Sequence, residues 1–499
     1  MRKSVFVLGC MAIFWGLVVP AQAEEQAGSD KAIYQAKVNI DPQRKHITGS
    51  VDITFWPKDT KHAYLHLYPY AFASEQSGAQ WDQLLGNDPT LATYASTRLS
   101  VDGKLVEGKR TGTILEVPLT EADGKKAGSM PTKIALDFDL TLPHNDGRMS
   151  YDDHSIWLGN WLPILAVEDQ HGWHLDPYEP TGDPFYSKNA DYEVDVTLPE
   201  GYQLASSATD FTAEVNTSQS GNRTYLLRAD DVRDFALVIM DGTYKRLEGK
   251  VGDTVIRTWW RNTDDADGAK HVHDAAAASL EYFNSEFGTY PYKEYDVVRV
   301  GGEINGMEYP ALVFLDGSHF TFGGTNATAT VVHETAHQWF YGLIGNDQIH
   351  EAWLDEGFTE YASLAFLYNK YPEVGFERVR KRLMYGTIVP FYVQEELRPW
   401  QELAAFPDNQ SYSDLVYSRT SSMLWMLRGA WGEKRLHEVL NQYAQKYRLG
   451  VADGEAWKAV LSDAAGEDAG AFLDYWLKLD MSQQDAAAAW LERQRKAPK

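Results

Sequence analysis

The sequence of 499 residues contains a single cysteine, Cys10, which lies in an apolar segment near the N-terminus. One thiol forms no disulfide within a chain, and removal of this segment on export would leave the folded protein without a thiolate nucleophile or metal ligand. Any metal site must therefore be built from histidines and carboxylates.

Positive charge is also scarce. The 46 lysines and arginines face 71 aspartates and glutamates, which gives a formal net charge of -25. A surface this acidic repels phosphate backbones and anionic lipid headgroups, so we expect no nucleic-acid partner. After residue 23 no apolar run approaches the roughly 18 residues of a membrane span, and we expect no span in the mature chain. The composition is that of a globular protein, and the length favours two or three domains.

The first 23 residues are typical of an export signal. Arg2 and Lys3 provide a positive start, residues 5–19 are mostly apolar, and residues 21–23 (Ala-Gln-Ala) offer a small-x-small cleavage site. The mature protein is therefore expected to be exported, to the periplasm or outside the cell. A lipid anchor on Cys10 is the alternative, although the apolar run before this cysteine is very short.

Alternation of apolar and polar residues runs from about residue 34 to residue 244. It predicts a β-rich N-terminal region, residues 24–245, whose strands are separated by Gly, Pro and Asp. The pattern then changes to helical periodicity, apart from a strand pattern at residues 295–300. We expect helices at residues 275–287, 327–343, 352–368, 422–430, 433–447 and 471–477. Residues 246–499 would form a second domain, and the whole chain a multidomain α+β protein.

The most informative motif is His333-Glu334-Thr335-Ala336-His337. On a helix, residues four apart share a face, so His333 and His337 can reach one metal ion while Glu334 stands beside the water bound to it. This arrangement is typical of zinc metalloproteases. The apolar residues of the flanking sequence, which contains no proline, predict a buried helix. The alternative is that two core or surface histidines happen to lie four residues apart.

A hydrolytic zinc needs a third protein ligand and an open position for water. Glu356 is the candidate, since it lies on a second predicted helix that follows a turn through residues 345–347. A helix hairpin would thus bring two imidazoles and one carboxylate together. Glu360, one helical turn later, would accept a hydrogen bond from a ligating imidazole or remain a solvated surface carboxylate.

A glycine-rich segment, residues 301–310 (GGEINGMEYP), precedes the first histidine. Together with the histidine motif, this segment resembles the G-x-M-E-N strand of the aminopeptidase N family of zinc exopeptidases. The family places eighteen residues between the second histidine and the glutamate ligand, and residues 338–355 match that spacing. Further matches occur at residues 234–236, 287–292, 416–417 and 426–428, so the resemblance covers about residues 34–477.

The resemblance implies a fold and a cofactor. The fold would be an N-terminal all-β, sandwich-like domain followed by a thermolysin-like catalytic domain with an α/β part and a helical lobe. One zinc ion per chain would be held by His333, His337 and Glu356. Glu334 would act as the general base.

The resemblance also implies how a peptide with a free N-terminus would bind. Glu308 would bind the α-ammonium of the substrate, and Tyr417 would stabilise the tetrahedral intermediate. The backbone of Gly306 and Met307 would pair with the substrate as an added strand. The function implied is removal of N-terminal amino acids from peptides.

Several positions depart from the family pattern. Tyr309 replaces the asparagine that follows the substrate-binding glutamate, and the sequence after Tyr417 differs, which makes Tyr412 the nearest rival for its role. For the residue of the N-terminal domain that helps to hold the amine, the sequence offers only the window of residues 152–154. The long C-terminal helical-repeat domain of many relatives has no counterpart after Leu477, so we expect a more open cleft.

Two other functions remain open at this stage. A zinc endopeptidase or oligopeptidase would use the same zinc site and Glu334 but would need no amine anchor, and Glu308 argues against it. A catalytically silent, exported binding protein on the same fold would have no need of the whole zinc site. Epoxide hydrolysis, known in one branch of the family, has no identifying feature here. A glycosylation sequence at Asn326, close to the zinc motif, favours a bacterial host, in which it would carry no glycan.

Overall fold

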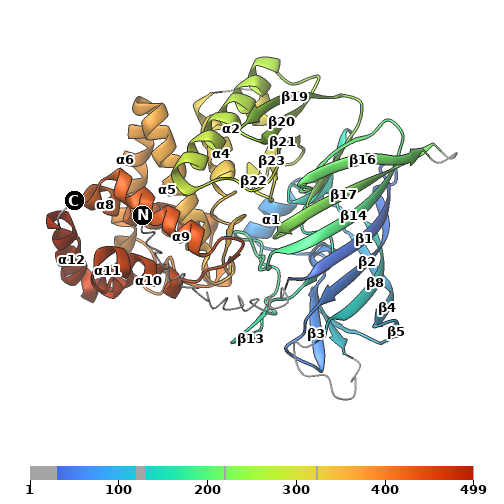
Figure 1. The fold of residues 1–499 in the computed structure, drawn as a ribbon, viewed down its shortest axis with the longest axis horizontal. Helices are drawn as coiled ribbons and strands as arrows, with labels where there is room; N and C mark the ends of the chain where they lie inside the picture. Colours follow the sequence, from blue (N-terminus) through green and yellow to red (C-terminus); the bar gives the residue numbers. More distant parts are fainter. Residues whose placement is uncertain (1–30, 120–129, 218–220, 322–323, 498–499) are drawn as a thin grey trace, which may run out of the picture. The chain divides into compact units, whose positions relative to one another are not determined.

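The computed structural model describes residues 31–119, 130–217, 221–321 and 324–497. The expected export signal lies outside these residues. Figure 1 shows strands in the first half of the described chain and mostly helices in the second half. The expected order, a β-rich N-terminal region followed by a mixed region with a helical lobe, is therefore confirmed.

The largest sheet of the N-terminal region has eight strands. In spatial order these are β16 (Asp210–Thr217), β17 (Asn222–Val232), β14 (Ala190–Pro199), β1 (Ile33–Asp41), β2 (His46–Phe55), β8 (Thr132–Thr141), β4 (Thr93–Val101) and β5 (Lys104–Leu105). In β1, Tyr34, Ala36, Val38 and Ile40 are buried while the residues between them face outward, as the alternation predicts. β1 pairs parallel with β14 and antiparallel with β2.

Smaller sheets complete this region. One consists of β15 (Gln203–Ser206), β18 (Leu237–Met240), β10 (Ser155–Leu158) and β9 (Met149–Tyr151). A second consists of β11 (Ile164–Leu165), β3 (His62–His66), β7 (Ile114–Pro118) and β6 (Lys109–Thr111). A third pairs β12 (Glu168–Asp169) with β13 (Gly172–Trp173). A short helix, α1 (Ala79–Leu85), lies between β3 and β4 in the sequence.

A five-stranded sheet supports the second region. Its spatial order is β19 (Tyr244–Val251), β20 (Thr254–Arg261), β21 (Glu294–Val300), β23 (Leu312–Asp316) and β22 (Gly306–Met307). β20, β21 and β23 run parallel, whereas β22 is an antiparallel edge strand. Central parallel strands are buried on both faces, which explains the nearly continuous burial of β21 and β23. The domain boundary expected at residue 245 falls at the start of β19.

Helices form the rest of the second region. They are α2 (Ala266–Phe287), α3 (Ser318–Thr321), α4 (Thr325–Ala336), α5 (Ala352–Lys370), α6 (Pro372–Ile388), α7 (Asn409–Tyr412), α8 (Thr420–Trp431), α9 (Glu433–Lys446), α10 (Gly454–Ala465), α11 (Gly470–Leu477) and α12 (Gln484–Lys496). In Figure 1, α2 and α4 lie beside the five-stranded sheet. A two-stranded pairing of β24 (Ile344–Gly345) with β25 (Gly450–Val451) links the segment before α5 to the one before α10.

The helix expected at residues 327–343 is shorter than predicted. It ends at Ala336, after which the Gln338 amide donates to the Thr335 carbonyl and the Gly342 amide to the His337 carbonyl. The apolar residues 339–344 that suggested a continuing helix instead form a buried turn leading into β24. Because His337 keeps helical dihedral angles as the residue after α4, it stays on the same face as His333.

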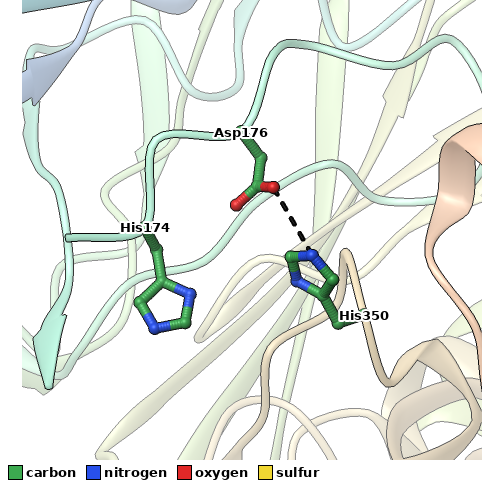
Figure 2. A group of neighbouring side chains, drawn as sticks. All are labelled: His174, Asp176 and His350. Atoms are coloured by element: carbon green, nitrogen blue, oxygen red, sulfur yellow. Dashed lines mark ion pairs between the residues drawn. The ribbon is translucent and has the colours of Figure 1, made fainter. Parts of the chain in front are cut away.

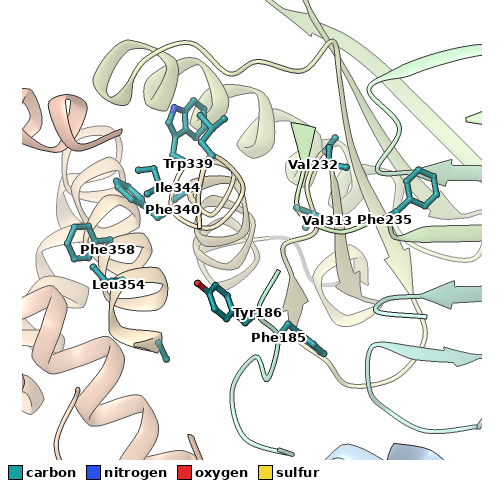
Figure 3. Close-up of a cluster of buried hydrophobic side chains, with 14 of the residues drawn as sticks. Phe185, Tyr186, Val232, Phe235, Val313, Trp339, Phe340, Ile344, Leu354 and Phe358 are labelled. Carbon is teal, nitrogen blue, oxygen red and sulfur yellow. The ribbon is translucent and has the colours of Figure 1, made fainter. Parts of the chain in front are cut away.

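One hydrophobic core joins the two regions. Figure 3 shows Phe185, Tyr186 and Phe235 from the β-rich region in the same buried cluster as Trp339 and Phe358. The buried Arg233 guanidinium strengthens this connection by donating to the carbonyls of Tyr341 and Gly450, at 2.9 and 3.0 Å. No helix in the described ranges is long and apolar enough to cross a membrane.

Candidate metal centre and active site

The two histidines and Glu356 meet as the sequence predicts. His333 Nε2 lies 3.1 Å from His337 Nε2 and 3.1 Å from Glu356 Oε2, and His337 Nε2 lies 3.2 Å from the same oxygen. Tetrahedral zinc with ligands at about 2.1 Å separates its ligand atoms by roughly 3.3 Å. The three donor atoms thus form one face of a zinc tetrahedron, and their side chains fit the ion.

Each imidazole contacts a carboxylate through Nδ1, the ring nitrogen that points away from the proposed metal site. His333 Nδ1 lies 3.4 Å from Glu360 Oε2, and His337 Nδ1 lies 2.7 Å from Asp355 Oδ1. Burial alone would raise the pKa of Glu360, but the Arg382 guanidinium and the His333 imidazole outweigh burial and lower this pKa to about 2. Such contacts fix the Nδ1–H tautomer and leave Nε2 free to bind metal. Sequence reasoning identified Glu360 but missed Asp355.

Glu334 projects from α4 into the same cleft. Its Oε2 atom is buried and has no hydrogen-bond partner among the described residues. Burial raises the pKa of this carboxyl to about 7, against the lowering influence of His333 and His337. The side chain is therefore free to bond to a water or substrate atom in the cleft.

The edge strand β22 passes directly over Glu334. A Cβ atom on Gly306 would lie 2.2 Å from Glu334 Oε1, so a larger residue at this position would displace the carboxylate or the strand. β22 pairs with β23 on one side, through Gly306 with Leu315 and Met307 with Phe314. The other side of this edge strand faces the cleft region, where an extended peptide can add as a further strand.

Glu308 follows β22 and is buried, with only 3% of its surface exposed. Its Oε1 lies 3.9 Å from His337 Nδ1 and has no hydrogen-bond partner among the described residues. Burial raises the pKa of Glu308, and the nearby Asp183 raises it further, while His337 lowers it. An unsatisfied buried carboxylate beside the metal ligands indicates a place for a cationic group.

Tyr417 lies in a π-helical turn (Ser413–Arg419) between α7 and α8. Its ring stacks on the His333 imidazole, with centroids 5.8 Å apart and an interplanar angle of 17°. Tyr412 packs edge-on against Tyr417 at 5.7 Å, and its buried hydroxyl has no partner in the described part of the chain. Burial raises the pKa of both phenols well above the usual value, so both remain hydrogen-bond donors at neutral pH.

These side chains line one cleft of about 560 Å³. The β-rich region contributes Arg148 and Asp183, which form an ion pair, and Arg148 also contacts Met307 Sδ at 3.0 Å. Burial raises the pKa of Asp183 to about 6, despite the opposing effect of Arg148. The window of residues 152–154 does not line this cleft, because Asp152 pairs with Arg261 elsewhere.

Asp183 is a buried carboxylate of the N-terminal region that lines the cleft, and sequence reasoning missed it. It lies in residues 157–186, a long segment of the sequence that shows neither strand nor helix periodicity. Its placement depends on contacts with Arg148 and the catalytic region that no local pattern reveals.

Comparison with known proteins agrees with this geometry. Residues 272–476 match the model of the peptidase family M1 domain. Aminopeptidase 2 of Candida albicans is 30% identical over 219 residues, which cover 41% of this chain and 23% of that protein. Aminopeptidase M1-D of Oryza sativa subsp. japonica is 25% identical over 260 residues, or 49% of this chain and 29% of that protein. The chain thus spans less than a third of the length of these relatives.

Solved structures show the same fold. A mutant of the M1 zinc metallopeptidase from Deinococcus radiodurans superposes with a TM-score of 0.65 at 18% identity, covering 90% of this chain and 94% of that one. A mutant of the same protein bound to a Tyr-Ser-Ala substrate gives a TM-score of 0.63. Residues 272–476 therefore resemble a peptidase family M1 domain in sequence, and the chain has the fold of an M1 zinc metallopeptidase.

Proposed function

We propose that this chain is a zinc-dependent aminopeptidase that removes N-terminal amino acids from peptides. The observation that carries the proposal is the buried Glu308, whose unsatisfied carboxylate oxygen lies beside the three metal ligands. A buried carboxylate without a partner is unfavourable unless a cation binds to it. The α-ammonium of a peptide provides that cation and would place the first peptide bond near the metal ligands.

Asp183, which lines the same cleft, supports the same assignment. It is buried, and its nearby negative charge contributes to the raised pKa of Glu308. Asp183 pairs with Arg148, whereas Glu308 makes no ion pair with an arginine among the described residues. Two acidic groups with one arginine between them favour a cationic ligand. The Arg148 guanidinium would hold Asp183 in place while Glu308 receives the substrate amine.

The hydrolytic step follows from the side chains around the metal site. Zinc, when held by His333, His337 and Glu356, supplies a Lewis acid and lowers the pKa of bound water. Glu334 would accept the proton of the attacking water and later deliver it to the leaving amine. Its free Oε2 leaves it available for both transfers.

Two further groups would bind the reacting peptide. The Tyr417 hydroxyl, which burial keeps protonated, would donate to the oxygen that gains negative charge in the transition state. The backbone of Gly306 and Met307 would pair with the substrate along the open side of β22. We also propose export to the periplasm or the cell exterior, which rests on the N-terminal sequence alone.

The test uses one decapeptide in a free and an N-acetylated form, followed over time by mass spectrometry. We expect a ladder of single N-terminal losses from the free form and no cleavage of the acetylated form, which cannot offer an ammonium group. Internal cuts in both forms would instead identify an endopeptidase.

A pair of variants links this specificity to the proposed anchor. Glu308→Gln should lower kcat/KM for a free dipeptide by about a hundredfold or more, because the substrate ammonium would lose its buried partner. Glu303→Gln removes an exposed carboxylate from the same cleft and should leave kcat/KM within about twofold. Equal effects of the two substitutions would contradict the role of Glu308.

A further inference from the structure

A second group of metal-binding side chains lies outside the active-site cleft. His174 and Asp176 come from the segment after β13, and His350 comes from the turn just before α5. One potential ligand atom from each residue lies within 4.8 Å of the others. Figure 2 shows the three side chains gathered around one small space.

Both imidazoles are oriented by a second carboxylate. His174 Nε2 lies 2.8 Å from Asp169 Oδ2, and His350 Nδ1 lies 2.9 Å from Asp347 Oδ2. His350 therefore has one ring nitrogen held and the other available, whereas the Nδ1 atom of His174 also lies 3.3 Å from Asp347 Oδ2 and would have to exchange this contact for a metal ion. The free nitrogen of His350, Nε2, faces Asp176 Oδ1 at 3.5 Å, and a ring nitrogen of His174 turns toward the same space. Carboxylate-oriented imidazoles of this kind are typical of metal sites.

We propose that His174, Asp176 and His350 bind a divalent transition-metal ion of the zinc type at a site separate from the catalytic centre. Two imidazoles and one carboxylate are ligands that such ions prefer. The site is open to ions, since the exposed side-chain fractions of the three residues are 18, 24 and 41%. The distances between the ligand atoms, at most 4.8 Å, would have to shorten to the roughly 3.3 Å of a zinc tetrahedron, which requires side-chain movement of about 1.5 Å or less.

The alternative is an ion-pair network without metal. Asp347 would then bridge two protonated imidazoles, since its Oδ2 also lies 3.3 Å from His174 Nδ1. Asp176 distinguishes the two arrangements. In the network, the ion pair that it makes among the described residues is a long one, at 3.5 Å with His350, whereas in the metal site it is a ligand.

A metal ion at this site would join two segments that are far apart in the sequence. The site connects the β-rich region to the turn that begins α5, the helix that carries Glu356. A bound ion would hold that turn against the segment after β13. Occupancy should therefore raise the melting temperature of the whole chain, because it stabilises the folded state alone.

The test counts zinc in a chain that lacks the catalytic site. His333→Ala removes a catalytic ligand, and calorimetric titration with zinc should then show one remaining site, whereas the unmodified chain should hold two zinc ions by elemental analysis. Adding Asp176→Asn to His333→Ala should abolish this site and the accompanying rise in melting temperature. Asp176→Asn leaves both histidines and their orienting carboxylates in place, so loss of folding is not expected.

A matched control uses another histidine–aspartate pair. His46 Nε2 lies 2.9 Å from Asp139 Oδ1 in the eight-stranded sheet, and in the described part of the chain this pair belongs to no group of three potential ligands. His46→Ala in the His333→Ala background should leave the zinc count at one, while His350→Ala should reduce it to zero. No zinc binding by His333→Ala, or binding that persists in the Asp176→Asn double variant, would overturn the proposal. Neither result bears on aminopeptidase activity, which is measured separately.

Discussion

Replacing Gly306 with alanine tests how closely strand β22, along which the substrate would pair, packs against Glu334. The added Cβ would lie 2.2 Å from Glu334 Oε1, whereas ordinary contacts of this kind are about 3.4 Å, so the carboxylate or the strand must move by about 1.2 Å. A displacement of about 1 Å in a catalytic group lowers the rate by about a hundredfold. We therefore expect Gly306→Ala to lower kcat by about two orders of magnitude.

Zinc binding should survive this substitution, because the three ligand atoms belong to α4, the residue after it, and α5, not to β22. The assay is hydrolysis of an aminoacyl 4-nitroanilide, with zinc content measured by elemental analysis on the same sample. Gly429→Ala is the matched control, since beyond the neighbouring backbone of its own helix no described atom lies within 4 Å of a Cβ at this exposed position. Native turnover in Gly306→Ala, or loss of zinc in parallel with activity, would refute the reasoning.

Three further predictions concern single side chains. Glu334→Gln should retain zinc and lower turnover by about a hundredfold or more, measured by elemental analysis and initial rates. Tyr417→Phe should lower kcat by roughly two to three orders of magnitude with little change in KM, while Tyr412→Phe should do much less; the reverse result would assign the role to Tyr412. Burial raises the pKa of Asp234 to about 7, so the folded state binds its proton more tightly than the unfolded state, and this group lowers stability as pH rises from about 4 to 7. The measurement is the free energy of unfolding in denaturant, for Asp234→Asn and for the original chain. The value for the variant minus that for the original chain should be more favourable to the variant at pH 8 than at pH 5. The same value at both pH values would contradict the raised pKa of Asp234.

The close approach of His333, His337 and Glu356 could be predicted because their arrangement is local. His333 and His337 are four residues apart, and the helical geometry of α4 fixes their common face whatever the rest of the chain does. Glu356 follows on the next long helix after a short connection, which limits where its side chain can lie. The distances of 3.1 to 3.2 Å between their donor atoms agree with the expectation that these three side chains lie close enough to bind one ion.

The rest of the site depends on tertiary packing and could not be predicted. Asp183 enters the cleft because Arg148 holds it there, and these two residues are 35 positions apart in the sequence. Asp355 lies behind His337 only because α5 packs beside α4. The end of α4 was also predicted wrongly, since residues 339–344 are as apolar as a helix face but are buried in a turn.

The π-helical turn has a consequence for how this segment tolerates changes in length. In an α-helix, residues five apart point about 140° away from each other, so Tyr412 and Tyr417 would face different directions. The wider turn at Ser413–Arg419 reduces this divergence, and both tyrosines line the cleft. Deleting one residue between them would give a spacing of four, which an ordinary α-helix also keeps on one face. An insertion would give a spacing of six and turn the rings about 120° apart in an α-helix, against about 40° for a spacing of four, so shortening should be tolerated better than lengthening.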